Sequence, residues 1–280
     1  MTESMYGVRI GVEAHVTLNT KEKLFCTCVN TKGEAPNSSC CAVCKKEDMA
    51  DMQVNREAVA QFLKAAKLLH CTLGDVLTFT RRYYDGPDMA GGYQLTQQTP
   101  VCVGGWLDLH HTRYGIQKIL LEEDSAKVFF RDGQLLYDYN RCGVPLIEVV
   151  SEPVFESGEE AVAFLRALRA LLMGNALTRG RMEWGEYRSD VNLSLLYQGV
   201  QCGEIIEIKN VNSFRDIQRA VQYETEQLIH CHKEGIEIQK RVMRYDQKNK
   251  KTCFLRGLSH NRFQQEPGIQ PIRIRDMQDV

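Results

Sequence analysis

The chain has 280 residues, with 35 Lys and Arg against 36 Asp and Glu, and a formal net charge of −1. Because 43% of the residues are hydrophobic and 25% are charged, the composition is that of a globular protein large enough to bury a core without disulfides. The balanced charge excludes a histone-like basic binder and an acidic disordered tail, whereas one local basic face would suffice for nucleic acid.

No apolar run is long enough to cross a bilayer, and the first six residues are too short and too polar for a secretory signal. No transit peptide is visible either. We therefore expect a cytoplasmic protein with no membrane association, and the mitochondrial matrix is the alternative compartment. The 11 cysteines are then expected as thiols or metal ligands rather than as a disulfide framework.

The first predicted elements are a strand, a cysteine-bearing loop and a helix. Strict alternation predicts a strand over residues 8–18, with Glu13 and His15 on its polar face. The cysteines lie in a loop over residues 23–46, and Asn55 is placed to cap a helix with an apolar stripe. Residues 80–92 are rich in Arg, Tyr, Gly and Pro and predict a loop.

The next segments predict mainly strands. Residues 116–130 contain one or two strands around the acidic run 122–124, and residues 144–150 form another. Ser157 and Glu160 indicate a capping box that begins a second helix.

Alternation returns at residues 187–195 and 204–209, and a third helix begins at Ser213 and stops at Gly235. From residue 233 onward the sequence is basic and poorly patterned. Long strands, few helices and no regular βαβ rhythm predict an α+β fold with a mostly antiparallel sheet.

Two cysteine pairs, Cys26 with Cys28 and Cys41 with Cys44, flank one loop. Four thiolates with this spacing are typical of a tetrahedral zinc site. Cys40 is an alternative to Cys41 as the third ligand, and a set of free buried thiols is the competing interpretation.

Carboxylates recur on the predicted strands. Glu13 and His15 point the same way at positions i and i+2, and Glu148 lies inside an apolar run. The acidic run 122–124 implies charge repulsion unless a cation is present, and Asp190 adds another carboxylate. Each residue alone is more often a surface or salt-bridged carboxylate, but together they suit magnesium or manganese, which could clamp a nucleoside triphosphate.

Four segments occur in an order that resembles one family. They are Gly-Val-Glu-Ala-His from Gly11, Leu-Glu-Glu-Asp from Leu121, Asn-Arg-Cys-Gly-Val-Pro-Leu-Ile-Glu-Val-Val-Ser-Glu-Pro from Asn140, and Glu-Ile-Lys-Asn-Val-Asn-Ser-Phe from Glu207. Together with Lys-Leu-Phe-Cys-Thr-Cys in the cysteine loop, they resemble the B subunit of aspartyl/glutamyl-tRNA(Asn/Gln) amidotransferase.

The resemblance implies that residues 1–280 form a cradle domain of glutamine-synthetase-like topology, with the zinc loop inserted at about residues 23–46 and the family's C-terminal helical and tail domains absent. It implies a carbon–nitrogen ligase that uses ATP to phosphorylate the side chain of Glu on tRNA(Gln), or of Asp on tRNA(Asn). Ammonia from a separate amidase subunit then displaces the phosphate. A small C-type subunit is the other implied partner. The chain itself carries neither a P-loop nor a G-x-S-x-G amidase signature.

The resemblance also assigns roles to residues. His15, Glu123 and Glu148 are expected to hold one magnesium, and Glu13 and Glu122 a second one linked to ATP. Expected catalytic residues are Glu13, Glu122 and Asp190; expected ATP-binding residues are Glu13, Arg188 and Lys209. Because Glu122 and Glu123 point to opposite faces of an ideal strand, both can be ligands only if the strand is bulged or ends there.

The sequence departs from the family pattern at residues 81–88, 182–190 and 262–267. With only a small basic stretch at residues 240–251, itself open to interpretation as a solvated face, we expect weak, salt-sensitive tRNA binding. Two alternatives stay open: a catalytically weakened relative that acts as a scaffold for the amidase, and a different ATP-dependent carboxylate–amine ligase on the same cradle.

Overall fold

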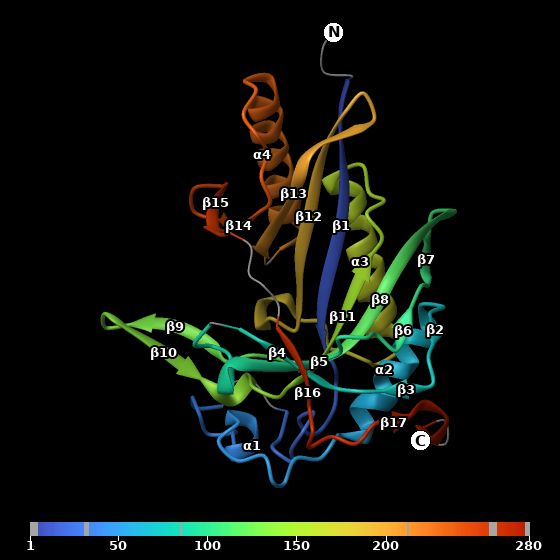
Figure 1. Cartoon of the computed structure of the whole chain (residues 1–280), viewed down its shortest axis with the longest axis vertical. Helices are drawn as coiled ribbons and strands as arrows, with labels where there is room; N and C mark the ends of the chain where they lie inside the picture. The colour runs from blue at the N-terminus through green and yellow to red at the C-terminus, as the bar shows by residue number, and fades with distance from the viewer. Residues whose placement is uncertain (1–4, 31–33, 85, 212, 258–261, 278–280) are drawn as a thin grey trace.

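A computed structural model describes residues 5–30, 34–84, 86–211, 213–257 and 262–277. Within these residues, ten strands form one large sheet in the order β15-β14-β13-β12-β1-β11-β8-β6-β2, with β7 beside β8 (Figure 1). The strands are β1 (Tyr6–Thr17), β2 (Thr72–Leu73), β6 (Cys102–Val103), β7 (Trp106–Leu109), β8 (Thr112–Glu123), β11 (Pro145–Ser151), β12 (Tyr187–Tyr197), β13 (Val200–Val211), β14 (Arg241–Asp246) and β15 (Lys251–Arg256). Of the described pairs in this sheet, β13 with β14 is parallel and the others are antiparallel, which confirms the predicted sheet type.

The three long helices begin where the sequence predicts. They are α2 (Arg56–Leu68), α3 (Gly158–Gly174) and α4 (Phe214–Lys233); the four-residue α1 (Ala42–Lys45) lies in the cysteine loop. The side chains of Asn55, Ser157 and Ser213 accept hydrogen bonds from backbone N–H groups in the first turns. The predicted capping box is only half formed, because Glu160 accepts from the backbone N–H of Glu156 and not of Ser157.

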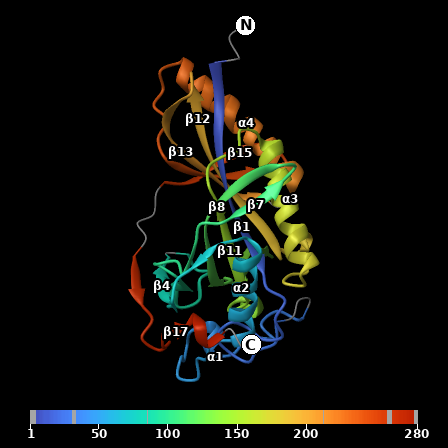
Figure 2. The ribbon, with the colours of Figure 1, turned by 90° about the vertical axis from the view of Figure 1, so that its right-hand side faces the viewer.

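Helices α3 and α4 cover one face of the large sheet and leave the other face open (Figure 2). The alternation of β1 explains this arrangement. Ile10, Val12 and Ala14 are fully or almost fully buried, whereas Glu13 and His15 line a cavity on the open face. One side of the strand therefore supplies the core and the other supplies polar groups to a site.

Smaller sheets lie beside the open face. Strands β4 (Thr80–Tyr83), β5 (Tyr93–Thr96) and β16 (Phe263–Gln265) form one, in the order β16-β4-β5, and β3 (Val76–Leu77) pairs with β17 (Ile272–Arg273). The predicted loop over residues 80–92 is therefore wrong at its start. Strand β4 has no apolar alternation of its own; it is held between β5 and a partner about 180 residues away along the chain.

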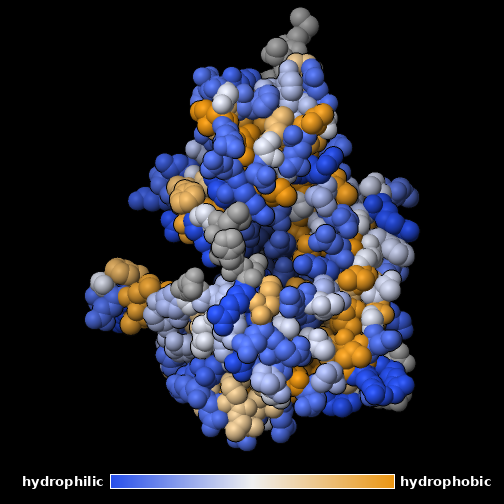
Figure 3. Space-filling model, in the orientation of Figure 1, coloured by the Kyte–Doolittle hydropathy of each residue, from blue (hydrophilic) through white to orange (hydrophobic). Residues whose placement is uncertain are grey.

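The hairpin of β9 (Lys127–Arg131) and β10 (Gln134–Asp138) projects from the body of the protein (Figure 1). Hydrophobic side chains gather on this arm (Figure 3), including the exposed Phe130 and Leu135. The remaining described elements are the 3-10 helices η2 (Ala90–Gly92), η3 (Tyr139–Arg141), η4 (Met182–Trp184) and η5 (Ile274–Met277).

The basic segment after residue 233 also contains strands that its sequence pattern did not predict. Val242, Met243 and Tyr245 of β14 are buried, and β14 runs parallel to β13. Among the described helices, none combines the length and apolarity that a membrane span requires.

Candidate functional site

A cavity of about 630 Å³ opens on the uncovered face of the large sheet, within the size range of small-molecule sites. Strands β1, β8, β11, β12 and β13 contribute its floor, and β4 and β5 contribute one wall. Hydrophilic side chains surround the hollow at the centre of the molecule (Figure 3). The polar faces of strands that are far apart in the sequence therefore meet at one site.

One group in the cavity consists of His15, Glu122 and Glu148. Each residue offers one ligand atom, and these atoms lie within 4.8 Å of one another. His15 and Glu148 face each other across β1 and β11, and Glu122 comes from the next strand, β8. The Glu122 carboxylate accepts hydrogen bonds from Thr96 Oγ1, at 2.5 Å, and Gln94 Nε2, at 3.0 Å. An imidazole and two carboxylates in this arrangement suit a hard divalent cation.

Burial disfavours the charged forms of the two carboxyl groups in this set. Burial, and then the neighbouring Glu122 carboxylate, raises the pKa of Glu148 to about 7. Burial also raises the pKa of Glu122. Two buried carboxyl groups that resist ionisation side by side are expected to bind a cation once both lose their protons.

A second group consists of Glu13, Asp190 and Glu207, whose ligand atoms also lie within 4.8 Å of one another. Lys209 Nζ lies 2.7 Å from Asp190 and 2.6 Å from Glu207. Burial lowers the pKa of Lys209, but these two carboxylates outweigh it and raise the pKa overall. For Glu13, burial raises the pKa, and Glu148 and Asp190 raise it further. The ionisation of the first group, which contains Glu148, is therefore coupled to that of the second, which contains Glu13.

Glu207 was not among the residues predicted for the site. The sequence contained a pattern that could have identified it, because Glu207 and Lys209 form a charged pair on the same side of one predicted strand. What the alternation could not reveal is that this side faces Asp190 on β12.

Glu123 lies apart from the ligands with which the resemblance grouped it. It is the last residue of β8, and its Oε1 accepts from the Leu95 N–H at 2.8 Å and lies 2.5 Å from Lys46 Nζ. Glu122 and Glu123 thus point to opposite faces, as strand geometry requires. In this structure, the carboxylate beside His15 and Glu148 is that of Glu122.

Arg188 forms a bidentate pair with Asp124, at 2.9 and 3.0 Å. Asp124 is buried, which would raise its pKa, but Arg141 and Arg188 lower that pKa to about 2. The guanidinium expected to bind ATP therefore already has a carboxylate partner. Arg188 still lines a second cavity of about 320 Å³ together with His15, Asp190 and Lys209. The three neighbouring acids at residues 122–124 therefore have different partners: Gln94 and Thr96 for the first, Lys46 for the second and Arg188 for the third.

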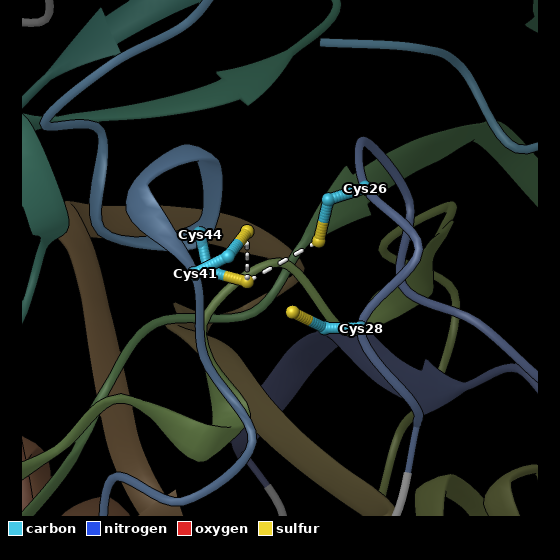
Figure 4. Close-up of side chains that lie close together, drawn as sticks. All are labelled: Cys26, Cys28, Cys41 and Cys44. Carbon is cyan, nitrogen blue, oxygen red and sulfur yellow. Dashed lines mark hydrogen bonds between the residues drawn. The ribbon is translucent and has the colours of Figure 1, made fainter. Parts of the chain in front are cut away.

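Cys26, Cys28, Cys41 and Cys44 come together, with their sulfur atoms directed at one centre (Figure 4). The Cys44 sulfur lies 3.2 Å from that of Cys26 and 3.7 Å from that of Cys41. A tetrahedron with Zn–S bonds of about 2.3 Å has an edge of about 3.8 Å, which the second distance matches, whereas the first is shorter. The remaining candidate, Cys40, is outside this group and donates to the Asn37 carbonyl.

Two features favour a thiolate at Cys44. The hydrogen bond between the Cys26 and Cys44 sulfurs lowers the pKa of Cys44 to about 4 in spite of burial, and the same bond, together with burial, raises the pKa of Cys26. The fully buried Lys23 donates from Nζ to the Cys44 sulfur, at 3.4 Å, and to the Ser39 carbonyl. The residues therefore fit a soft, thiolate-binding metal ion.

Comparisons with known proteins point to one family. The GatB/GatE catalytic domain family matches residues 8–278. The B subunit of the aspartyl/glutamyl-tRNA(Asn/Gln) amidotransferase from Lawsonia intracellularis is 38% identical over 276 residues, which are 95% of this chain and 58% of that protein. The corresponding B subunit from Nitratidesulfovibrio vulgaris is 38% identical over 280 residues, 96% of this chain and 59% of that protein. The chain thus spans about three fifths of the length of these relatives.

Proposed function

The chain belongs to the GatB/GatE catalytic domain family, and on that premise we propose that it catalyses ATP-dependent amidation of Glu on tRNA(Gln) or Asp on tRNA(Asn). The substrate carboxylate attacks the γ-phosphate of ATP, which gives an acyl phosphate and ADP. Ammonia then displaces phosphate and leaves the amide. The observation that carries this proposal is the pair of cation-binding groups on one cavity, because phosphoryl transfer depends mainly on charge neutralisation and positioning.

We assign one magnesium to His15, Glu122 and Glu148. Glu122 replaces Glu123 in this set because its carboxylate lies with the other two. A magnesium ion would neutralise phosphate charge and orient the phosphate groups. Hydrogen bonds from Gln94 and Thr96 hold the Glu122 carboxylate in place, so that the protein supplies an ordered ligand before any cation arrives.

We assign the second cation and the triphosphate to the group of Glu13, Asp190 and Glu207. Lys209 bridges Asp190 and Glu207. Its ammonium is one of the positive groups that line this cavity, together with Lys240 and Arg256, and we propose that it pairs with a phosphate oxygen when a cation takes over the two carboxylates. Asn192 Nδ2 donates to Glu13 at 2.8 Å and orients that carboxylate. Arg188 contributes by fixing Asp124 at the edge of the neighbouring cavity.

We propose zinc for the four cysteines, with a structural role. All four positions of a tetrahedral zinc are taken by sulfur, which is typical of sites that stabilise a loop rather than bind substrate. Lys23 offsets part of the negative charge that four thiolates would impose on this centre.

The partners follow from the chemistry. The chain carries no G-x-S-x-G amidase signature, so we propose that its ammonia comes from an amidase subunit, with a small C-type subunit completing the assembly. Misacylated tRNA is proposed to bind weakly, because the exposed basic residues of the β14–β15 hairpin, such as Arg244, Lys248 and Lys250, offer only a small electrostatic surface.

Ammonium chloride can replace the amidase in a direct test. The purified chain is incubated with MgATP, Glu-tRNA(Gln) or Asp-tRNA(Asn), and ammonium chloride, and the amino acid released from the tRNA is identified. We expect Gln or Asn, and we expect Glu148→Gln to abolish its formation, whereas Glu226→Gln, on the exposed side of α4, retains it. If no amide forms, and a separate binding measurement shows that the chain binds the amidase, the result would support the scaffold instead.

A further inference from the structure

The cysteine loop reaches the end of the strand that carries Glu122. Helix α1 holds Cys44 and ends at Lys45, and the next residue, Lys46, adopts a left-handed conformation with φ of 56°. The backbone N–H of Lys46 donates to the Val43 carbonyl at 3.0 Å. Lys46 is therefore tied to the turn that presents two of the four thiols.

The side chain of Lys46 is buried against β5 and the end of β8. Its Nζ lies 2.5 Å from Glu123 Oε1, and the two side chains are only 2% and 4% exposed. The same ammonium donates to the Tyr93 carbonyl and lies 4.2 Å from the centre of the Tyr93 ring. At Gly91 a Cβ would lie 2.9 Å from Lys46 Cβ, so the packing around this side chain is tight.

Strand β5 links this ion pair to the cavity. Leu95 donates its backbone N–H to Glu123 Oε1 at 2.8 Å. The residues on either side of it, Gln94 and Thr96, donate their side chains to the two oxygens of Glu122. Gln94 Nε2 also donates to the backbone carbonyl of Glu123 at 2.9 Å. The position of β5 thus depends on Glu123, and the orientation of the Glu122 carboxylate depends on β5.

We propose that Lys46 is a positioning residue that couples the four-cysteine metal site to the carboxylate cavity. A zinc ion held by the four thiolates would fix α1 and with it Lys46; Lys46 holds Glu123, and Glu123 holds β5 against Glu122. The inference rests on the proposed function for the cation at His15, Glu122 and Glu148. Because a buried carboxylate without its partner is strongly unfavourable, displacement of Lys46 must move Glu123 as well. The coupling is reciprocal, so zinc and the cavity cation strengthen each other's binding.

Mn²⁺ is a suitable probe, since its binding is followed by electron paramagnetic resonance of the free ion. The whole chain is titrated with Mn²⁺ in its zinc-loaded and zinc-depleted forms. We expect depletion to weaken Mn²⁺ binding by about 5- to 150-fold, the range of coupled sites. Lys46→Met is expected to retain zinc, to bind Mn²⁺ weakly and to respond little to depletion.

Lys45→Met is the matched control. This neighbouring lysine pairs with the exposed Glu47, at 2.8 Å, and within the described residues no ion pair joins it to β8, so the variant is expected to behave as the wild type. Glu123→Gln removes the carboxylate that Lys46 holds and provides a second variant if Lys46→Met does not fold; it is expected to retain zinc and to bind Mn²⁺ weakly.

Amide hydrogen exchange over residues 93–96 tests the coupling without any cavity cation. Zinc depletion is expected to speed exchange at the Leu95 amide in the wild type. If Mn²⁺ does not bind to zinc-loaded protein, the proposed cation site is wrong, and the exchange data still decide on the coupling. Equal Mn²⁺ affinity and equal Leu95 exchange with and without zinc would overturn the inference.

Discussion

Glu148 allows the charge balance of the cavity and its cation affinity to be tested with one substitution. The residue is 8% exposed, and burial and the Glu122 carboxylate raise its pKa to about 7. Glutamine has nearly the same size and no charge. Without divalent cations, we expect Glu148→Gln to become more stable than the wild type as the pH rises, and magnesium to favour the wild type.

The size of the effect follows from the pKa. An ordinary glutamate has a value of 4.5, against about 7 here, and each pH unit between them is worth about 1.4 kcal/mol. Between these two pH values, Glu148 is protonated in the folded protein and ionised in the unfolded chain. Its contribution to the free energy of unfolding is therefore fully present below pH 4.5 and is lost as the pH rises through 7. The wild type should lose about 3 kcal/mol that Glu148→Gln keeps. Magnesium at 100 times its Kd would restore about 2.7 kcal/mol.

Urea unfolding at pH 5 and pH 8, in chelator and in magnesium chloride, measures the loss of stability with pH and the stabilisation by magnesium. The difference in unfolding free energy between the two proteins is the relevant quantity, because it cancels the titration of groups that do not interact with Glu148. Free energies that run parallel from pH 5 to pH 8 in chelator would refute the electrostatic reasoning. Equal stabilisation of both proteins by magnesium would refute Glu148 as a ligand.

Three further outcomes are expected. Purified protein should contain one zinc per chain by elemental analysis; Cys26→Ser should lower this content, and a protein that binds no zinc would contradict the assignment. Arg188→Met should destabilise the fold by about 3–5 kcal/mol in urea unfolding, because it removes a principal partner of the buried Asp124; a loss below 1 kcal/mol would contradict the pair's structural role. Lys209→Met should raise the KM for ATP while the circular dichroism spectrum is unchanged; an unaltered KM would remove Lys209 from the nucleotide site.

The sequence alone determined the features that depend on neighbouring residues. The alternation of β1 and β12 follows from the two-residue period of a strand, and the helix starts at Asn55, Ser157 and Ser213 follow from capping within one turn. The sequence also showed the two cysteine pairs, because the members of each pair lie within four residues of each other along the chain. The family resemblance came from short ordered segments of the same kind.

The tertiary structure decided which strands meet and which face of each borders the cavity. Strand β4 exists because β5 and β16 hold it, and no nearby residue encodes the distant partner. Alternation required Glu122 and Glu123 to point apart, but only the packing of β8 between β11 and β6 placed Glu122 beside His15 and left Glu123 to Lys46. A period of two specifies opposite faces without specifying their surroundings, because those depend on long-range strand pairing.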